Sequence, residues 1–398
     1  MIPLLVFTAI LTCGADDPWA KVKDLKTGTE LRVYKKGASQ PLLVKMDELT
    51  DENLVVVNKN AQVAIAKDQI DRVDFRPAKP RMTKDDDWWI GQGMATALYP
   101  AHRSKASAKM RLQADGNVTV SSATHDLGTG MYTVLAIVGA QSLEIPYERV
   151  RAVLGDSGLP PAPGAGGSQS TASVGPAVVV AAESIKKKLI DVAVKEKKSP
   201  FHGAKLEELS YASGEIHGNG KSLSFEQLLA TLDRSAIEAT GSAALSDEDE
   251  EKYAFDSFGA QFCEVKVHDL TGEVRVNRFS SVMDIGTVVS EKTARSQIVG
   301  GVVFGIGMAL LEETRYDIRS GWIANRNIAE YLVPTNADIP AVEVEFLNHP
   351  DFEFNSIGAR GIGEIGITGT PAALANAVFH ATGKRIRQLP IRPEHFLG

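Results

Sequence analysis

Residues 355–385 constrain the fold of this chain most strongly, because a glycine-dense loop runs directly into a helix signal there. The loop has glycine at positions 358, 361, 363, 366 and 369 and contains one acidic residue, Glu364. Such a loop lets a ligand approach the backbone closely, and the N-terminus of the helix that follows favours an anionic group. Glu364 is therefore predicted to be held where it can act as a general base.

The helix is expected to take Thr370 as its N-cap and Pro371 as its first residue. Its apolar face is expected to comprise Ala372, Ala373, Leu374, Ala377, Val378 and Ala381. Composition leaves a simpler interpretation open, in which a tight loop precedes an ordinary amphipathic helix and Glu364 is solvated.

The charge and cysteine content limit the classes of function. The chain has 398 residues, enough for two or three domains, and a net charge of -7 with acids and bases interleaved. This pattern argues against a nucleic-acid binder, which would present a basic face. Two cysteines, Cys13 and Cys263, cannot build an iron–sulfur cluster or a structural zinc site. Any iron–sulfur centre that serves this protein must therefore lie on another chain.

The N-terminus carries an apolar run over residues 2–12, followed by Gly14 and Ala15. The run is too short to span a bilayer but fits the apolar region of a secretory signal, so residues 1–15 are a candidate signal peptide. The protein would then be periplasmic or otherwise exported. An N-terminal strand or buried anchor in a cytoplasmic protein is the alternative, and no membrane span is predicted.

Two regions of different character follow. Residues 16–77 contain five short strand patterns separated by turn signals, which predict a small antiparallel β-barrel similar to an SH3-like fold. Residues 78–90 are expected to be a linker. Residues 91–398 alternate strand pairs with helices and predict an α+β domain of mixed sheets with packed helices. Hairpins are expected to turn at residues 115–117 and 270–272, and a long helix is expected from Pro176 to about Lys197.

Three loop-to-helix junctions recur, at residues 125–130, 166–171 and 358–370. Each places small residues and free backbone N–H groups near a helix start, and together they could cradle a phosphate-bearing cofactor. None is a Walker A or Rossmann loop. A further helix over residues 293–313 contains four glycines, which predicts close packing against another backbone.

Four segments, in this order, resemble signatures of the molybdenum hydroxylases, the xanthine dehydrogenase and aldehyde oxidase family. They read THDLGTGMYT, GDSGLPPAPGAGGSQSTASVG, TARSQIVGGVVFGIGMALLEE and GARGIGEIGITGTPAALANAVFHATGKRIRQLPI. The resemblance implies the C-terminal half of a molybdopterin-binding subunit, with Glu364 as the catalytic base. It implies cofactor contacts from Gly128, Thr129, Gly130, Ser168, Gln169, Ser170, Thr171, Gln297, Gly361 and Gly363. In this family the dithiolene of the cofactor holds molybdenum, so the resemblance implies no metal-ligating side chains.

The implied activity is oxidation of an aldehyde or N-heterocycle, with water as the oxygen source. The front half of such subunits carries a glycine-rich loop and an arginine-containing loop that are not found in this sequence. The expected partners are therefore a front-half molybdopterin subunit, an iron–sulfur subunit and an FAD subunit. The alternative is a non-catalytic exported binding protein or a truncated relic that keeps only the fold.

Overall fold

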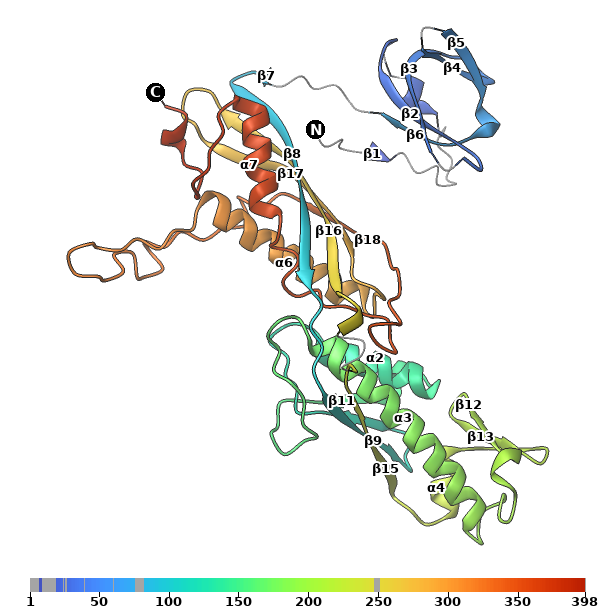
Figure 1. Ribbon diagram of the computed structural model, residues 1–398. Helices are drawn as coiled ribbons and strands as arrows, with labels where there is room; N and C mark the ends of the chain where they lie inside the picture. The colour runs from blue at the N-terminus through green and yellow to red at the C-terminus, as the bar shows by residue number, and fades with distance from the viewer. Residues whose placement is uncertain are drawn as a thin grey trace. The chain divides into compact units, whose positions relative to one another are not determined.

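The computed structural model describes residues 7–8, 19–23, 25, 27–38, 40–59, 61–75, 82–246 and 251–397. The chain divides into two compact units, Met1–Lys84 and Asp85–Gly398 (Figure 1). The candidate signal peptide, residues 1–15, lies outside the described residues except for the short strand β1 (Phe7–Thr8).

The N-terminal unit is one antiparallel sheet with the strand order β1-β6-β2-β3-β4-β5. Besides β1, its elements are α1 (Ala20–Lys23), β2 (Glu30–Lys35), β3 (Leu42–Leu49), β4 (Asn53–Asn58), β5 (Ala61–Ala66), η1 (Lys67–Gln69) and β6 (Ile70–Phe75). Leu31, Val33, Leu54 and Val56 are at most 2% exposed and form the centre of its core. The five strands expected in this region are confirmed, whereas the likeness to an SH3 barrel stays a prediction.

The boundary between the two units, Lys84/Asp85, lies within the expected linker, residues 78–90, but residues 83–90 of that linker contain strand structure. Strand β7 (Thr83–Asp85) and the 13-residue strand β8 (Trp88–Pro100) occupy this stretch. Trp88 and Trp89 pair with His268 and Val267 of strand β16 (Asp256–His268). Polar and proline-rich composition marked a boundary here, but pairing with a distant strand decides the local structure.

One lobe of the C-terminal unit is a five-stranded sheet with the order β18-β17-β16-β8-β7. Strand β17 (Val274–Asp284) is antiparallel to β16 and parallel to β18 (Val342–Phe346). Helices α6 (Glu291–Leu310) and α7 (Thr370–Thr382) share a core with this sheet. Figure 1 shows α7 lying along β8, where a Cβ at Gly93 would be 2.1 Å from the Ala373 carbonyl oxygen. Glycine in β8 therefore lets the helix backbone approach the strand.

The other lobe is a four-stranded sheet with the order β11-β10-β9-β15, in which only β10 and β11 are parallel. Its elements are β9 (Ala106–Gln113), β10 (Val118–Ser121), α2 (Met131–Leu143), η2 (Tyr147–Arg149), β11 (Val150–Val153), α3 (Ser170–Lys195) and β15 (Ala236–Ala243). A small appended part comprises η3 (Leu206–Glu208), β12 (Ser210–Ala212), β13 (Glu215–Gly218), β14 (Lys221–Ser224) and α4 (Phe225–Thr231). Near the C-terminus lies η4 (Pro393–His395). Mixed sheets with packed helices confirm the predicted α+β class.

Two helix starts differ from expectation. Helix α3 begins at Ser170, not at Pro176, which lies inside it and is buried. A proline in a helix removes one hydrogen bond, and burial of neighbours such as Val174 and Val178 offsets that loss. Helix α7 takes Gly369, with φ of 79°, as its N-cap, so Thr370 becomes the first helical residue.

Thr370 is fully buried, and its hydroxyl donates to the Gly366 carbonyl at 3.0 Å. Ala372 is exposed and does not belong to the apolar face, because the buried positions 370, 373, 374, 377, 378 and 381 recur every three or four residues and leave Ala372 on the outer side.

Turn chemistry and glycine packing were predicted correctly. The expected turns join β9 to β10 and β16 to β17. On α6, a Cβ at Gly301 would lie 2.6 Å from the Gly366 backbone, and one at Gly305 would lie 2.5 Å from Thr370 Cβ. The glycine-rich helix therefore packs directly on the glycine loop that precedes α7.

Candidate functional site

Glu364 lies where the glycine loop (residues 355–369) meets the start of α3. The Ser168 hydroxyl donates to Glu364 Oε2 at 2.7 Å. A Cβ at Gly361 would be 2.7 Å from the Ser168 carbonyl oxygen, and one at Gly363 would be 3.5 Å from Gln297 Oε1 on α6. The absence of side chains at these two glycines lets the loop approach both α3 and α6. The structure thus brings together Glu364, Ser168, Gln297, Gly361 and Gly363.

Tyr99 on β8 also contacts Glu364, and the sequence did not indicate it. Burial, together with the hydrogen bond to Glu364 and the charge of that carboxylate, raises the pKa of Tyr99 to about 12. A phenol with such a pKa stays protonated and donates to the carboxylate. Tyr99 pairs with Ser257 of β16, whose hydroxyl donates to the Gly361 carbonyl at 2.7 Å. Two neighbouring sheet residues, Tyr99 and Ser257, therefore contact the Glu364 carboxylate and the glycine loop respectively.

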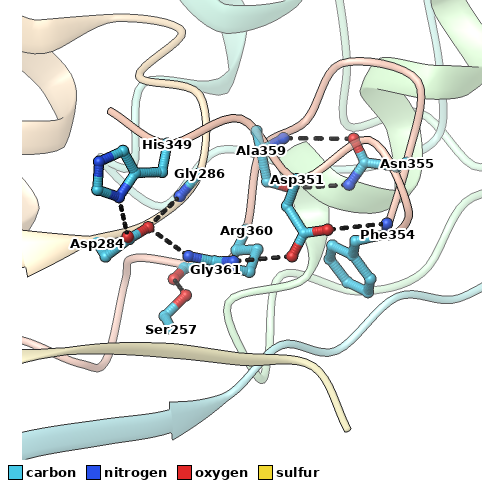
Figure 2. A network of polar contacts seen from close by, with 10 residues as sticks. All are labelled: Ser257, Asp284, Gly286, His349, Asp351, Phe354, Asn355, Ala359, Arg360 and Gly361. Atoms are coloured by element: carbon cyan, nitrogen blue, oxygen red, sulfur yellow. Dashed lines mark hydrogen bonds and ion pairs between the residues drawn. The ribbon is translucent and has the colours of Figure 1, made fainter. Parts of the chain in front are cut away.

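Charged side chains hold the glycine loop in place, and Figure 2 shows their contacts. Arg360 forms ion pairs with Asp284, at the end of β17, and with Asp351 at 2.7 Å. Asp284 is only 2% exposed and also contacts His349 Nδ1 at 2.8 Å. The Asn355 side chain donates to a loop carbonyl four residues ahead at 2.7 Å. We call Arg360, Asp284 and Asp351 the loop brace. No sequence motif identifies the loop brace, because Asp284 is distant in sequence from Asp351 and Arg360 and the three residue types are common on protein surfaces.

The second junction, at the start of α3, lies beside this loop. Ser168 adopts a left-handed backbone with φ of 57°, and Gln169 is the N-cap. The Gln169 side-chain oxygen accepts a hydrogen bond from Ser104 at 2.7 Å. Ser170 is buried, and the Thr171 hydroxyl contacts Met131 Sδ, at the start of α2, at 3.4 Å. The first backbone N–H groups of an α-helix have no partner within the helix, so the start of α3 can accept an anion.

The first junction differs from expectation because its N–H groups are not free. The Asp126 carboxylate accepts the backbone N–H groups of Gly128 at 2.8 Å, Gly130 at 3.1 Å and Tyr132 at 3.3 Å. The Thr129 hydroxyl is directed to the same carboxylate at 3.4 Å. Burial of Asp126 opposes its ionisation, but the N–H donors of Gly130 and Gly128 outweigh it and hold its pKa below the ordinary value. This junction already contains a negative charge.

All three junctions nevertheless converge. A Cβ at Gly130 would meet Thr293 of α6 at 2.5 Å, so the α2 junction borders the helix that carries Gln297. A cleft of about 590 Å³ opens beside the α3 junction, and its lining includes His102, Arg103 and Gln169. The sequence predicted this convergence through the three glycine-rich segments but gave no sign of the basic side chains of the cleft.

The donors at this site fit a cofactor that brings its own metal ligands. They are hydroxyl, amide and backbone N–H groups around glycines that leave room for close approach. Across the described ranges, no group of three or more His, Cys, Asp or Glu side chains could hold a metal ion. Glu364 itself is exposed although Ser168 donates to it, so its carboxylate remains accessible.

The chain matches the family of molybdopterin cofactor-binding domains over residues 66–340 and belongs to this family. It is 38% identical over 322 residues to the aldehyde oxidoreductase molybdenum-binding subunit PaoC of Escherichia coli (strain K12), covering 81% of this chain and 42% of PaoC. It is 30% identical over 339 residues to the probable hypoxanthine oxidase XdhD of the same strain, covering 82% of this chain and 33% of XdhD. The predicted membership of the molybdenum hydroxylase family is confirmed.

Solved structures agree with this assignment. Quinoline 2-oxidoreductase from Pseudomonas putida 86 superposes with a TM-score of 0.66 at 26% identity, over 78% of this chain and 41% of that chain. Cu,Mo-CO dehydrogenase shares the fold, with a TM-score of 0.67 at 23% identity. The chain thus spans less than half the length of these relatives.

Proposed function

We propose that this chain is the part of a molybdenum-dependent hydroxylase that binds molybdopterin and carries the catalytic base. The observation that carries the proposal is the Glu364 carboxylate, which receives hydrogen bonds from Ser168 and Tyr99 where the three junctions converge. The names of the relatives PaoC, XdhD and quinoline 2-oxidoreductase support an aldehyde or an N-heterocycle as the substrate class. Water would be the source of oxygen.

When bound, molybdopterin would supply two-electron redox chemistry at a molybdenum ion held by its dithiolene. Glu364 would accept the proton of the water-derived oxygen as that oxygen is transferred, while Ser168 and Tyr99 keep the carboxylate oriented. General-base catalysis of this kind is worth roughly 100- to 10,000-fold in rate.

The other residues predicted to contact the cofactor would bind different parts of it, according to the charge that each junction favours. Gln169, Ser170 and Thr171 at the start of α3 would hold the phosphate of the cofactor, because helix N-termini favour anions. Gln297, Gly361 and Gly363 would allow close approach of the cofactor to the loop. Gly128, Thr129 and Gly130 would contact an uncharged part of the cofactor, since Asp126 disfavours a second negative charge at their junction.

Other chains would complete the enzyme. A front-half molybdopterin subunit would supply the part of PaoC that the match does not include, since the match covers 42% of that relative. An iron–sulfur subunit and an FAD subunit would carry electrons away, because Cys13 and Cys263 are too few for a cluster. The name of a relative from Paenarthrobacter nicotinovorans, 6-hydroxypseudooxynicotine dehydrogenase complex subunit gamma, supports such an assembly. A signal peptide over residues 1–15 is a further proposal, which N-terminal sequencing of the mature chain would test.

The test is the molybdenum and pterin content of the complex purified through a tag on this chain. We expect near-stoichiometric molybdenum and pterin in the wild type and a clear loss of both in Thr171→Val. Thr231→Val is the matched control, because Thr231 is an exposed residue of α4 whose hydroxyl bonds only within its own helix. A complex without molybdenum and pterin would contradict the proposal and favour a non-catalytic relic.

A further inference from the structure

A groove of about 620 Å³ lies at the opposite end of the five-stranded sheet from Glu364. Trp88, the first residue of β8, lines this groove, whereas Tyr99, which contacts Glu364, lies near the other end of the same 13-residue strand. A strand of that length spans about 40 Å. The groove is therefore separate from the site described above, and its volume is within the range of about 300–1,000 Å³ that is usual for binding pockets.

The groove follows an open edge of strand β17. Strand β18 pairs with β17 only from Phe279 to Met283, so residues 274–278 of β17 have no strand on that side among the described residues. Four consecutive residues of this open stretch, 274–277, line the groove. Because successive side chains of a strand point to opposite faces, a single groove contacts four in a row only where it runs along the edge. The open stretch therefore presents backbone N–H and C=O groups to the groove that no described strand pairs.

The segment that leads into β18 does not close this edge. Because β18 runs parallel to β17, a straight continuation of β18 toward its N-terminus would bring residues 337–341 alongside residues 274–278. Pro340 has no backbone N–H and cannot continue the hydrogen-bonded ladder. Ala337 and Asp338 line the groove instead. The groove thus lies where the pairing between the two strands has ended.

The two faces of the open edge differ in their chemistry. Val274 and Val276 lie on the face that packs against the helices, where Leu310 of α6 also lines the groove. Arg275 lies on the other face and is exposed, and Lys266 of β16 pairs in register with it and lines the same groove. A strand added to this edge would therefore turn alternate side chains toward an apolar surface and toward a polar, cationic surface.

Lys266 is the charge of this groove that is available to a partner. Arg275 Nε pairs with Glu273 at 2.7 Å, and the Arg275 guanidinium lies 5.2 Å from the centre of the Trp88 ring. Because β8 and β17 lie on opposite sides of β16, this contact draws Arg275 across the sheet and away from the open edge. Asp338 accepts two hydrogen bonds from its own segment, both at 2.8 Å. Lys266 has no ion-pair or hydrogen-bond partner in the described part of the chain, so a ligand side chain that faces it is expected to be acidic.

We infer that the open edge of β17 binds an extended peptide segment of a partner protein, with alternating apolar and acidic side chains, by strand addition. Backbone hydrogen bonds to the edge would supply affinity, and the alternate side chains would supply specificity. The apolar side chains would pack against Val276 and Leu310, and the acidic ones would face Lys266. The inference does not rest on the proposed function, because the groove contains none of the residues assigned to the cofactor or to the base.

Fluorescence anisotropy with short labelled peptides tests the inference on the full chain. A peptide of three Val-Asp repeats is expected to bind at least about tenfold more tightly than one of three Val-Lys repeats. Two further Val-Asp peptides carry backbone N-methyl groups, one on every valine and the other on every aspartate. In an added strand only one of these sets of N–H groups faces β17, so one methylated peptide should lose about tenfold or more in affinity while the other keeps it. Equal binding of the two methylated peptides, or no binding of the Val-Asp peptide, would overturn the inference.

Two pairs of variants locate the bound peptide. Lys266→Glu should reverse the preference between the Val-Asp and Val-Lys peptides, whereas Lys187→Glu, at an exposed position of α3, should leave it unchanged. Ala337→Trp puts a large side chain into the groove from an exposed position and should weaken Val-Asp binding about tenfold or more. Ala329→Trp, also exposed but outside the groove, is its control. An unchanged preference in Lys266→Glu or unchanged binding in Ala337→Trp would contradict the inference. So would a dimer of the wild-type chain that Ala337→Trp disrupts, because a second copy would then occupy the edge.

Discussion

The α2 junction and the α7 junction look alike in sequence, but the structure uses their acidic residues in opposite ways. In each, an acid and several glycines precede a helix by a few residues. Asp126 folds back onto the N–H groups of its own loop. Glu364 instead contacts Ser168 of the α3 junction and Tyr99 of β8. The first carboxylate stabilises local structure, whereas the second is presented to other elements and to solvent.

The loop brace accounts for the difference. Arg360 and its partners Asp284 and Asp351 fix the backbone ahead of Glu364, so the carboxylate need not stabilise its own loop. The α2 junction has no comparable ion pair among the described residues, and its loop depends on Asp126. A carboxylate is thus available for chemistry where other charges hold its loop in place.

Breaking the loop brace should have the largest effect on stability. Arg360→Met leaves Asp284, 2% exposed, without its arginine partner and should lower the free energy of unfolding by about 3–5 kcal/mol. Arg278→Met is the control, because Arg278 and Glu343 are 48% and 59% exposed and such surface pairs contribute about 0–1 kcal/mol. Urea unfolding measures both variants. Equal losses would show that the brace is no more important than a surface pair.

The next largest effect is expected when Glu364 loses one of its hydrogen-bond donors. Tyr99→Phe deletes a hydrogen bond to a charged group, which typically contributes about 1.5–3 kcal/mol, so turnover should fall roughly 10- to 100-fold. Molybdenum and pterin content should stay at the wild-type level. Tyr147→Phe, at an exposed position of η2, should change neither quantity. If Tyr99→Phe retains full turnover, Tyr99 does not orient the carboxylate.

Two adjacent glycines of α6 test the packing on the glycine loop. Gly301→Ala places a Cβ 2.6 Å from the Gly366 backbone and should destabilise the chain by about 1–3 kcal/mol. Gly300→Ala meets nothing within 4 Å and should stabilise the helix by about 0.5–1 kcal/mol. Thermal unfolding of the isolated chain compares them. The same sign for both variants would contradict the proposed loop–helix contact.

The smallest effect is expected at the α2 junction. Asp126→Ala should cost about 1 kcal/mol through loss of a helix-capping side chain. Because the folded-state pKa of Asp126 lies below its unfolded value, its stabilisation is present at neutral pH. That stabilisation is lost as the pH falls below the ordinary aspartate pKa of about 4.

The pH dependence of stability should therefore weaken in Asp126→Asn across this acidic window. It should be unchanged in Asp191→Asn, where an exposed carboxylate pairs with Lys195 on α3. Urea unfolding at a series of pH values measures both variants, and identical curves for wild type and Asp126→Asn would exclude the capping role.

Local chemistry in the sequence predicted the hairpins, the α+β class and the three junctions, because turn residues and periodicity act over a few positions. The predicted starts of the helices were less accurate. The sequence predicts a helix start at Pro176, although α3 begins at Ser170 and continues through Pro176, and Gly369 rather than Thr370 caps α7. The pairs Tyr99–Glu364 and Arg360–Asp284 are separated by many residues, and packing of the glycine loop against the sheet, not spacing, brings them together. Such contacts depend on tertiary structure that no local pattern contains.

Glu364 is the proposed catalytic base, so the decisive measurement is the turnover of Glu364→Gln at equal molybdenum and pterin content. We expect turnover to fall by roughly 100- to 10,000-fold while both contents stay at the wild-type level. Glu353→Gln, at an exposed position of the same C-terminal segment, should be fully active. Turnover of Glu364→Gln close to that of the wild type would contradict the assignment of Glu364 as the base.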